Sequence, residues 1–186
     1  LLRGHGAEII DADLLAREAV APGRGAYQAV VASFGTDILA ADGQLDREKL
    51  GGWVFADKGR RKQLEGLVHP YVRRETERRR VEIQRQRPDA LIVLDVPLLF
   101  EAGMDAGLSE IVVVYVPFTV QLGRLMRRDN LSEAAARARI GAQMDLEIKR
   151  RRATRVIDNS GNREETRLQV AQLYKALQTV QGADGA

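Results

Sequence analysis

Two uninterrupted apolar runs restrict the folds open to this chain more than any other feature. The first covers residues 90–96 and contains a single acid, Asp95; the second covers residues 111–116 and is stopped by a proline. Runs of this length without polar alternation are typical of strands buried on both faces of a parallel sheet. Shorter apolar runs at residues 7–10 and 155–157 fit two further strands. Helical patterns separate the four runs, so the sequence predicts an α/β fold with a mainly parallel sheet.

The segments between the predicted strands read as helices. Residues from about 36 to 88 predict a helical subdomain, in which Asp46 caps one helix. We expect Pro70 to separate two helices, because the residue before a proline is pushed away from helical angles. The arginine-rich segment at about 127–155 predicts a smaller helical flap, called the lid segment below. Right-handed crossovers would place the carboxyl ends of the strands, and with them Asp95, along one edge of the sheet.

Composition limits the class of protein. A chain of 186 residues, 45% apolar and 30% charged, suits a single soluble domain with its own core. The chain has no cysteine, which excludes disulfides and thiolate chemistry. Its net charge of +3 is modest, and its arginine clusters indicate an anionic small molecule as readily as nucleic acid. No apolar run approaches the length of a membrane span, so we expect a cytoplasmic protein with no membrane partner.

Two acids, Asp11 and Asp13, follow the first predicted strand directly, and a helical pattern begins at Leu14. Ligands of open α/β sheets bind at the carboxyl ends of the strands, so both acids are candidates for chemistry. Either could instead cap the helix, because Asp is a favoured cap and its charge suits the positive end of the helix dipole. One acid would be enough for capping. The second acid, with Arg17 about one turn later, therefore indicates a functional role.

A dense run of charges lies between Arg73 and Arg80 and mixes arginine with glutamate at helical spacing. The arginines could form a surface for nucleic acid. A solvated helix face with ion pairs between neighbouring turns is the interpretation that we favour.

Several short motifs occur in a fixed order, and each of them alone is weak. They are Ile10-Asp11-Ala12-Asp13 with Ala16-Arg17, Pro22-Gly23, Phe34-Gly35, Ala41-Asp42-Gly43, His69-Pro70, Pro97-Leu98-Leu99-Phe100-Glu101, Arg124 with Arg128-Asp129, Ala142-Gln143 and Val156-Ile157-Asp158-Asn159. Together they make the chain resemble the dephospho-coenzyme A kinase family over nearly its whole length. The family usually carries Ala-Asp where this chain has Ala153-Thr154, which puts a role for an acid there in doubt.

The resemblance implies a three-layer sandwich of the P-loop nucleotide-kinase type. It also implies ATP-dependent phosphorylation of the 3′-hydroxyl of dephospho-coenzyme A, with Mg²⁺ as cofactor and no nucleic-acid partner. Asp13 matches the family's catalytic acid, and Asp11 would support the site or approach Mg²⁺ through water. Arg17 would pair with a substrate phosphate, or form an ion pair with Asp13 or Glu18. Asp95 would hold Mg²⁺ through water or make a structural hydrogen bond.

The resemblance also assigns residues to the two substrates. On the nucleotide side, Arg124 and Arg128 would grip phosphates or stack on adenine, with Arg139 and Lys149 as secondary candidates. Asn159 would meet adenine, or merely cap the next helix. On the coenzyme A side, the residues are His69, Leu98, Leu99, Phe100 and Glu101, the leucines and Phe100 packing on pantetheine and Glu101 accepting a hydrogen bond.

Kinases of this type begin with a strand and a Gly-x-x-x-x-Gly-Lys-Ser/Thr loop, which cradles phosphates on backbone N–H groups. These 186 residues contain no such loop. The opening Leu1-Leu2 followed by glycines reads as the last turn of a helix, so we expect about 20 to 25 preceding residues to be missing. We also expect this chain to be inactive or nearly so. Two alternatives remain open: another small-molecule kinase, such as a nucleoside monophosphate kinase, and a non-enzymatic module that binds RNA or other anions.

Overall fold

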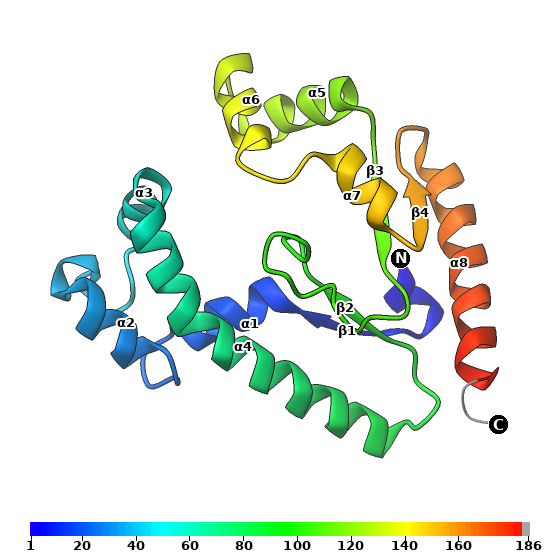
Figure 1. The fold of residues 1–186 in the computed structure, drawn as a ribbon, viewed down its shortest axis with the longest axis horizontal. Coiled ribbons are helices and arrows are strands. Elements are labelled where there is room, and N and C mark those ends of the chain that lie inside the picture. The colour runs from blue at the N-terminus through cyan, green and yellow to red at the C-terminus, as the bar shows by residue number, and fades with distance from the viewer. Residues whose placement is uncertain (184–186) are drawn as a thin grey trace. The chain divides into compact units, whose positions relative to one another are not determined.

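The computed structural model describes residues 1–183, and strands and helices alternate along them as predicted (Figure 1). All four predicted strands are confirmed, with small shifts in their bounds. The elements are, in chain order, η1 (Leu2–His5), β1 (Glu8–Asp11), α1 (Ala12–Ala19), α2 (Tyr27–Phe34), η2 (Thr36–Ile38), α3 (Arg47–Ala56), α4 (Lys58–Gln86), β2 (Ile92–Asp95), β3 (Val112–Tyr115), α5 (Phe118–Asp129), α6 (Glu133–Gly141), α7 (Leu146–Arg152), β4 (Arg155–Asp158) and α8 (Arg163–Ala183).

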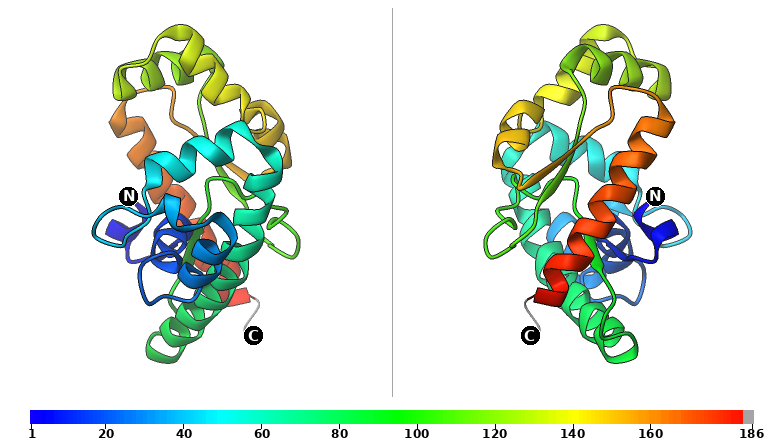
Figure 2. Two further views of the ribbon diagram at one scale, coloured as in Figure 1. Left: turned by 90° about the vertical axis from the view of Figure 1, so that its left-hand side faces the viewer. Right: turned by 90° about the vertical axis from the view of Figure 1, so that its right-hand side faces the viewer.

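The chain divides into two compact units, and the first consists of Ala7–Val96. In this unit β1 and β2 form a parallel pair, in register from Glu8 opposite Ile92 to Asp11 opposite Asp95. Helices α1, α2 and α3 pack on the long helix α4, which runs beside α1 and α2 in Figure 2. The core of the unit joins these layers through buried apolar side chains of each element, among them Ile10, Leu15, Val30, Ile38, Leu50 and Val68.

Helix α4 differs from the prediction, because it continues through Pro70 without a break. A proline inside a helix removes one backbone hydrogen bond and ordinarily kinks or ends the helix. Here Val68 and Val72 lie on either side of Pro70, four positions apart on one helix face, and both are buried in the core. Packing of that face favours helix on both sides of the proline and outweighs the local signal. The predicted separation into two helices is therefore wrong.

The second unit consists of Leu1–Gly6 and the chain from Pro97 onward. Strands β3 and β4 pair in parallel, from Val112 opposite Arg155 to the ends of both strands. Helix α7 packs on β3, and α8 packs on β4 and on η1. A small core forms around Phe100, Ile111 and Val113, with half-buried apolar side chains from the end of the lid segment against it.

The strands are less buried than the sequence predicts. Val113 points into the core of its unit, whereas Val114 is 57% exposed and Val156 is 38% exposed. Successive side chains of a strand point to opposite faces, so only one face of the β3–β4 pair rests on the described core. The apolar residues of β2 are only half-buried. Burial of these strands on both faces is thus not what the structure shows, although the parallel α/β class is confirmed.

The charge run on α4 is a ladder of ion pairs, as the favoured interpretation predicts. Glu75 accepts hydrogen bonds from both Arg78 and Arg79, and Arg79 also reaches Glu18 on α1 at 2.6 Å. Arg80 pairs with a glutamate one turn earlier. The arginines of α4 are therefore partly neutralised within their own unit, and one of them fastens α4 to α1.

Candidate active site

The register of β1 and β2 brings two predicted acids together, because Asp11 and Asp95 are opposite one another at the carboxyl ends of the strands. Asp11 is also the N-cap of α1, and its Oδ1 accepts a hydrogen bond of 2.9 Å from the N–H of Leu14. The capping alternative is therefore correct for Asp11. Capping does not explain Asp13, which is the second residue of the same helix and lies in its first turn.

Asp13 is exposed and, among the residues that the structure describes, accepts no hydrogen bond and forms no ion pair. A carboxylate in the first helical turn is held in place by the backbone and retains all its lone pairs for a ligand. The capping explanation does not account for it. Asp13 is thus positioned to accept a hydrogen bond from a bound hydroxyl group.

The three acids influence one another electrostatically. Burial raises the pKa of Asp95 above its usual range, and the negative charges of Asp11 and Asp13 raise it further. Adding a third negative charge to this edge is unfavourable, so a bound cation or hydroxyl donor would relieve the repulsion. Across the described part of the chain, however, no three acid or histidine side chains are arranged to ligate a metal directly. The carboxylates suit a hydrated Mg²⁺ ion, and the role of Asp95 stays a prediction.

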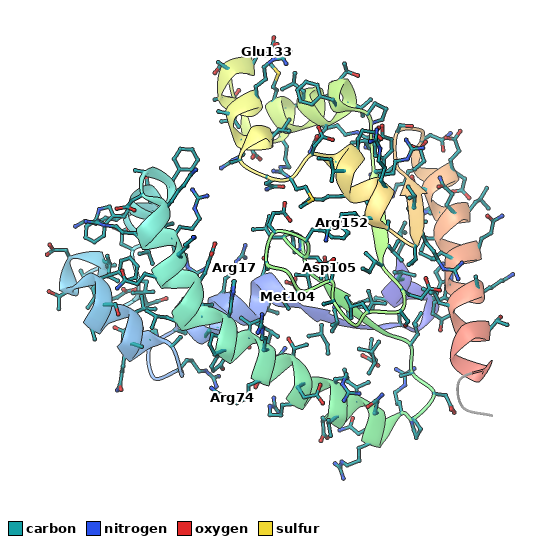
Figure 3. All side chains as sticks on the ribbon, viewed as in Figure 1. Arg17, Arg74, Met104, Asp105, Glu133 and Arg152 are labelled. Atoms are coloured by element: carbon teal, nitrogen blue, oxygen red, sulfur yellow. The ribbon has the colours of Figure 1, made fainter. Side chains whose placement is uncertain are left out.

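Arg17 lies on the same face of α1 as Asp13, four positions later. It is exposed and makes no ion pair within the described residues; Figure 3 labels it on α1. Sequence analysis offered two ion-pair partners for Arg17. Glu18 pairs with Arg79 instead, and Asp13 forms no ion pair within the described residues. The ion-pair alternative is therefore wrong. An exposed, unpaired guanidinium beside an exposed acid is suited to an anionic ligand that also carries a hydroxyl group.

His69, which the resemblance places on the coenzyme A side, lies in the middle of α4 and is half-buried. It follows the buried Val68 directly. No described side chain forms an ion pair with it. Its substrate contact stays a prediction.

The predicted pantetheine residues differ in exposure. Phe100 is buried and forms the centre of the core of its unit with Ile111 and Val113. The guanidinium of Arg152 lies 4.5 Å from the centre of the Phe100 ring. Leu99 packs against the same core and is half-buried, whereas Leu98 is 45% exposed. Of the three apolar residues, Leu98 has the most surface to offer a ligand, and Phe100 has a structural function.

Glu101 and Lys149, predicted to contact opposite substrates, form an ion pair with each other. The Nζ atom of Lys149 lies 2.7 Å from Oε1 of Glu101 and 3.2 Å from the backbone oxygen of Pro97. Lys149 is 8% exposed and is the one buried charged residue in the described part of the chain. Burial raises the pKa of Glu101, but hydrogen bonds from Lys149 and from the Met144 N–H hold it below its usual range overall. The charged groups of Glu101 and Lys149 are thus paired with each other within the protein.

Two nucleotide-side candidates meet at the start of the last helix. Arg124 on α5 donates a 2.7 Å hydrogen bond to the backbone oxygen of Asn159, which follows β4. The side-chain oxygen of Asn159 accepts a hydrogen bond from Thr166. The first turn of α8 is capped by Asn162, whose Oδ1 accepts from two backbone N–H groups. The alternative that Asn159 caps this helix is therefore wrong, and Asn162 is a cap that the sequence analysis missed.

The other two arginines predicted on the nucleotide side, Arg128 and Arg139, share one acid. Arg128 contacts both oxygens of Asp129, and Arg139 on α6 reaches the same carboxylate at 2.5 Å. These contacts, led by the hydrogen bond from Arg128, lower the pKa of Asp129. The sequence analysis did not predict that Asp129 connects α5 to α6 through these arginines, although its position directly after two arginines was a signal.

Thr154 occupies the position where the family usually has Asp. Its hydroxyl donates a hydrogen bond to Glu110 and accepts one from the backbone N–H of Ile111, just before β3.

The parallel α/β arrangement, with acids at the strand ends and arginines on the helices that follow, is the fold of a small-molecule kinase. Two solved structures share it. A crystal structure from Thermus thermophilus is 34% identical, with a TM-score of 0.75 over 95% of this chain and 87% of the other. A dephospho-CoA kinase from Campylobacter jejuni is 28% identical, with a TM-score of 0.68 over 95% of this chain and 88% of the other.

A family model described as dephospho-CoA kinase matches residues 1–165. A dephospho-CoA kinase from Symbiobacterium thermophilum is 45% identical over all of this chain and 77% of its own length. One from Moorella thermoacetica is 44% identical over 96% of this chain and 84% of its own length. The chain belongs to the dephospho-CoA kinase family. Among the described helices, none combines the length and apolar character that crossing a membrane requires.

Proposed function

We propose that this chain transfers the γ-phosphoryl group of ATP to the 3′-hydroxyl of dephospho-coenzyme A. The observation that supports the assignment is the exposed carboxylate of Asp13 in the first turn of α1, just after β1. Within the described residues neither it nor the neighbouring Arg17 forms an ion pair. Family membership supports a kinase, and this pair of side chains suits an acceptor that has both a hydroxyl group and a diphosphate.

Asp13 would act mainly by orientation. The oxygen of the sugar hydroxyl forms a bond to the γ-phosphorus, the bond from that phosphorus to the β-γ bridging oxygen breaks, and ADP leaves. Phosphoryl transfer passes through a loose transition state, so positioning and charge neutralisation supply most of the catalysis. A carboxylate is a weak base, so it takes the hydroxyl proton only as the new bond develops. Arg17 would hold the diphosphate of the acceptor.

The arginines of α5 and α6 would bind ATP. Arg124 keeps guanidinium donors beyond the one used on Asn159, and Arg128 is largely exposed beside Asp129. Planar guanidinium groups suit phosphate oxygens and the face of adenine. Asn159 and Arg139 belong to the same proposed nucleotide site. Mg²⁺, when bound, would neutralise charge on the phosphates, and Asp95 and Asp11 are the residues that would hold its water shell.

The domain roles and partners belong to the same proposal. The segment at about 36–88, which contains His69, would serve the coenzyme A side. Leu98, which lies outside that segment, would be a further contact to the same substrate, and the lid segment at 127–155 would serve the nucleotide. We propose no nucleic-acid partner, and the pairing of the α4 arginines with glutamates supports that view.

The test compares the wild-type chain with Asp13→Asn, and uses Asp37→Asn as a control because Asp37 is an exposed acid of the same unit without a described ion pair. Calorimetry measures binding of dephospho-coenzyme A, and mass spectrometry measures coenzyme A formed from ATP. We expect Asp13→Asn to lower product formation by about 100-fold or more while binding changes little. Equal product formation by Asp13→Asn and wild type would refute the role of Asp13.

Substrate choice is tested in parallel. Phosphorylation of a nucleoside monophosphate without any of dephospho-coenzyme A would instead indicate a nucleotide kinase. Steeply salt-dependent RNA binding would indicate the non-enzymatic module. Because the 186 residues contain no Gly-x-x-x-x-Gly-Lys-Ser/Thr loop, we expect slow turnover, so the product assay uses high enzyme concentrations. Turnover in an ADP-release assay as fast as that of kinases with the loop would contradict this expectation.

A further inference from the structure

Helix α7 makes two ion pairs with the loop that follows Pro97. Lys149 pairs with Glu101 at 2.7 Å, and Arg152 pairs with Asp105 at 2.6 Å. Figure 3 shows Arg152 and Asp105 side by side, next to Met104. We call this set of contacts the α7 clamp.

Lys149 is the central member of the clamp. Its side chain is 10% exposed, and two of its three N–H donors are used, one on Glu101 and one on the Pro97 backbone oxygen. An isolated buried ammonium is costly, so it is stable in this place only together with its partners. A lysine that is enclosed and paired in this way has little capacity left to grip a phosphate.

Glu101 joins the clamp to the end of the lid segment. Besides Lys149, it accepts a 2.9 Å hydrogen bond from the backbone N–H of Met144, just before α7. One carboxylate therefore fixes the loop after Pro97 to α7 and to the chain that leads into it. The loop is also closed by its own backbone bonds, such as the one from the Met104 N–H to the Leu99 oxygen.

We infer that Lys149 is a positioning residue for dephospho-coenzyme A rather than a ligand of ATP. It acts through Glu101 and the backbone of Pro97, and so sets the position of the exposed Leu98 between them. This inference rests on the proposed function, in which Leu98 contacts the pantetheine arm. It predicts that damage to the clamp reaches the acceptor and spares the nucleotide.

The test uses Lys149→Met, Glu101→Gln and the double variant, with Arg151→Met as the matched control. Arg151 is on the same helix, carries the same charge, and is exposed without a described partner. Calorimetry gives the affinities for dephospho-coenzyme A and for ATP. We expect about tenfold weaker binding of dephospho-coenzyme A for each single variant. We expect little further loss in the double variant, because each single change already breaks the Lys149–Glu101 ion pair at the centre of the clamp. We expect unchanged binding of ATP throughout.

A second readout does not depend on any ligand. Hydrogen exchange at the Met144 and Met104 amides reports directly whether the loop is held. We expect exchange at these amides to be about tenfold faster in Lys149→Met and Glu101→Gln than in the wild type. In Arg151→Met we expect the wild-type exchange rate. Glu101→Gln keeps a hydrogen-bonding side chain, so it provides the measurement if Lys149→Met does not fold.

Two results would overturn the inference. Weaker ATP binding by Lys149→Met, with dephospho-coenzyme A unaffected, would make Lys149 a nucleotide ligand. Unchanged exchange at both amides would show that the clamp does not hold the loop. Failure of the wild-type chain to bind dephospho-coenzyme A would instead count against the proposed function, and the exchange data would still decide whether the clamp exists.

Discussion

Glu75 allows the sharpest prediction about stability. The substitution Glu75→Gln keeps the shape of the side chain and removes its charge. Hydrogen bonds from Arg78 and, after the opposing effect of burial, from Arg79 lower the pKa of Glu75 to about 2 from an ordinary 4.5. A carboxyl whose pKa is lower in the folded protein stabilises that state above the unfolded pKa. The stabilisation is lost as the pH falls towards the folded pKa.

The size of the effect follows from the exposure of the partners. The lowered pKa sets a ceiling of about 3 kcal/mol, at about 1.4 kcal/mol for each factor of ten in the ionisation constant. The side chain of Arg78 is 65% exposed and that of Arg79 is 32% exposed, so solvent screens much of the electrostatic stabilisation of the ion pairs. We expect Glu75→Gln to lower the free energy of unfolding by about 1 kcal/mol at pH 7, or about 2–4 °C in Tm.

The assay is urea unfolding of both proteins, followed by circular dichroism at pH 7 and pH 3. The difference in unfolding free energy should fall to less than half at pH 3, because that pH lies between the two pKa values. Glu65→Gln serves as control, since Glu65 is on the same helix and forms no ion pair within the described residues. A difference that is the same at both pH values would refute the electrostatic explanation and assign the effect to packing.

Two further predictions concern the acids and the core. Asp13→Asn should lower the pKa of Asp95, because the negative charge at Asp13 raises it; an unchanged carboxyl titration by ¹³C NMR would show that the two do not interact. Leu15→Ala, at a fully buried position, should cost about 2–5 kcal/mol of unfolding free energy, whereas Leu14→Ala, 47% exposed, should cost far less. Equal losses in urea unfolding would contradict the burial of α1.

The sequence predicts elements well where a local signal and the packing agree. The apolar runs locate all four strands, and Asp46 caps α3 through the N–H of Lys49 as expected. The sequence fails where packing opposes the local signal, as at Pro70. Propensity at one residue cannot register that Val68 and Val72 are both buried against other helices.

The candidate site divides in the same way. Asp11 and Asp13 could be found from the sequence because the end of a strand is a local pattern. The pairing of Lys149 with Glu101 could not, since 29 basic and 26 acidic residues offer many alternatives and only the fold selects among them. The sequence also could not show which of Asp11 and Asp13 caps α1, because either one satisfies the rules for an N-cap.

Within the part of the chain that the structure describes, the β1–β2 ribbon that carries Asp11 and Asp95 has two strands. A pair that small is barely stable in water without other support. The edge that carries these two acids therefore depends on the neighbouring helices of its unit for its rigidity. A mild denaturant that separates α4 from α1 and β1 should make the distance between these acids variable before α4 itself unfolds. If the proposed function is correct, loss of activity would then precede loss of helical content.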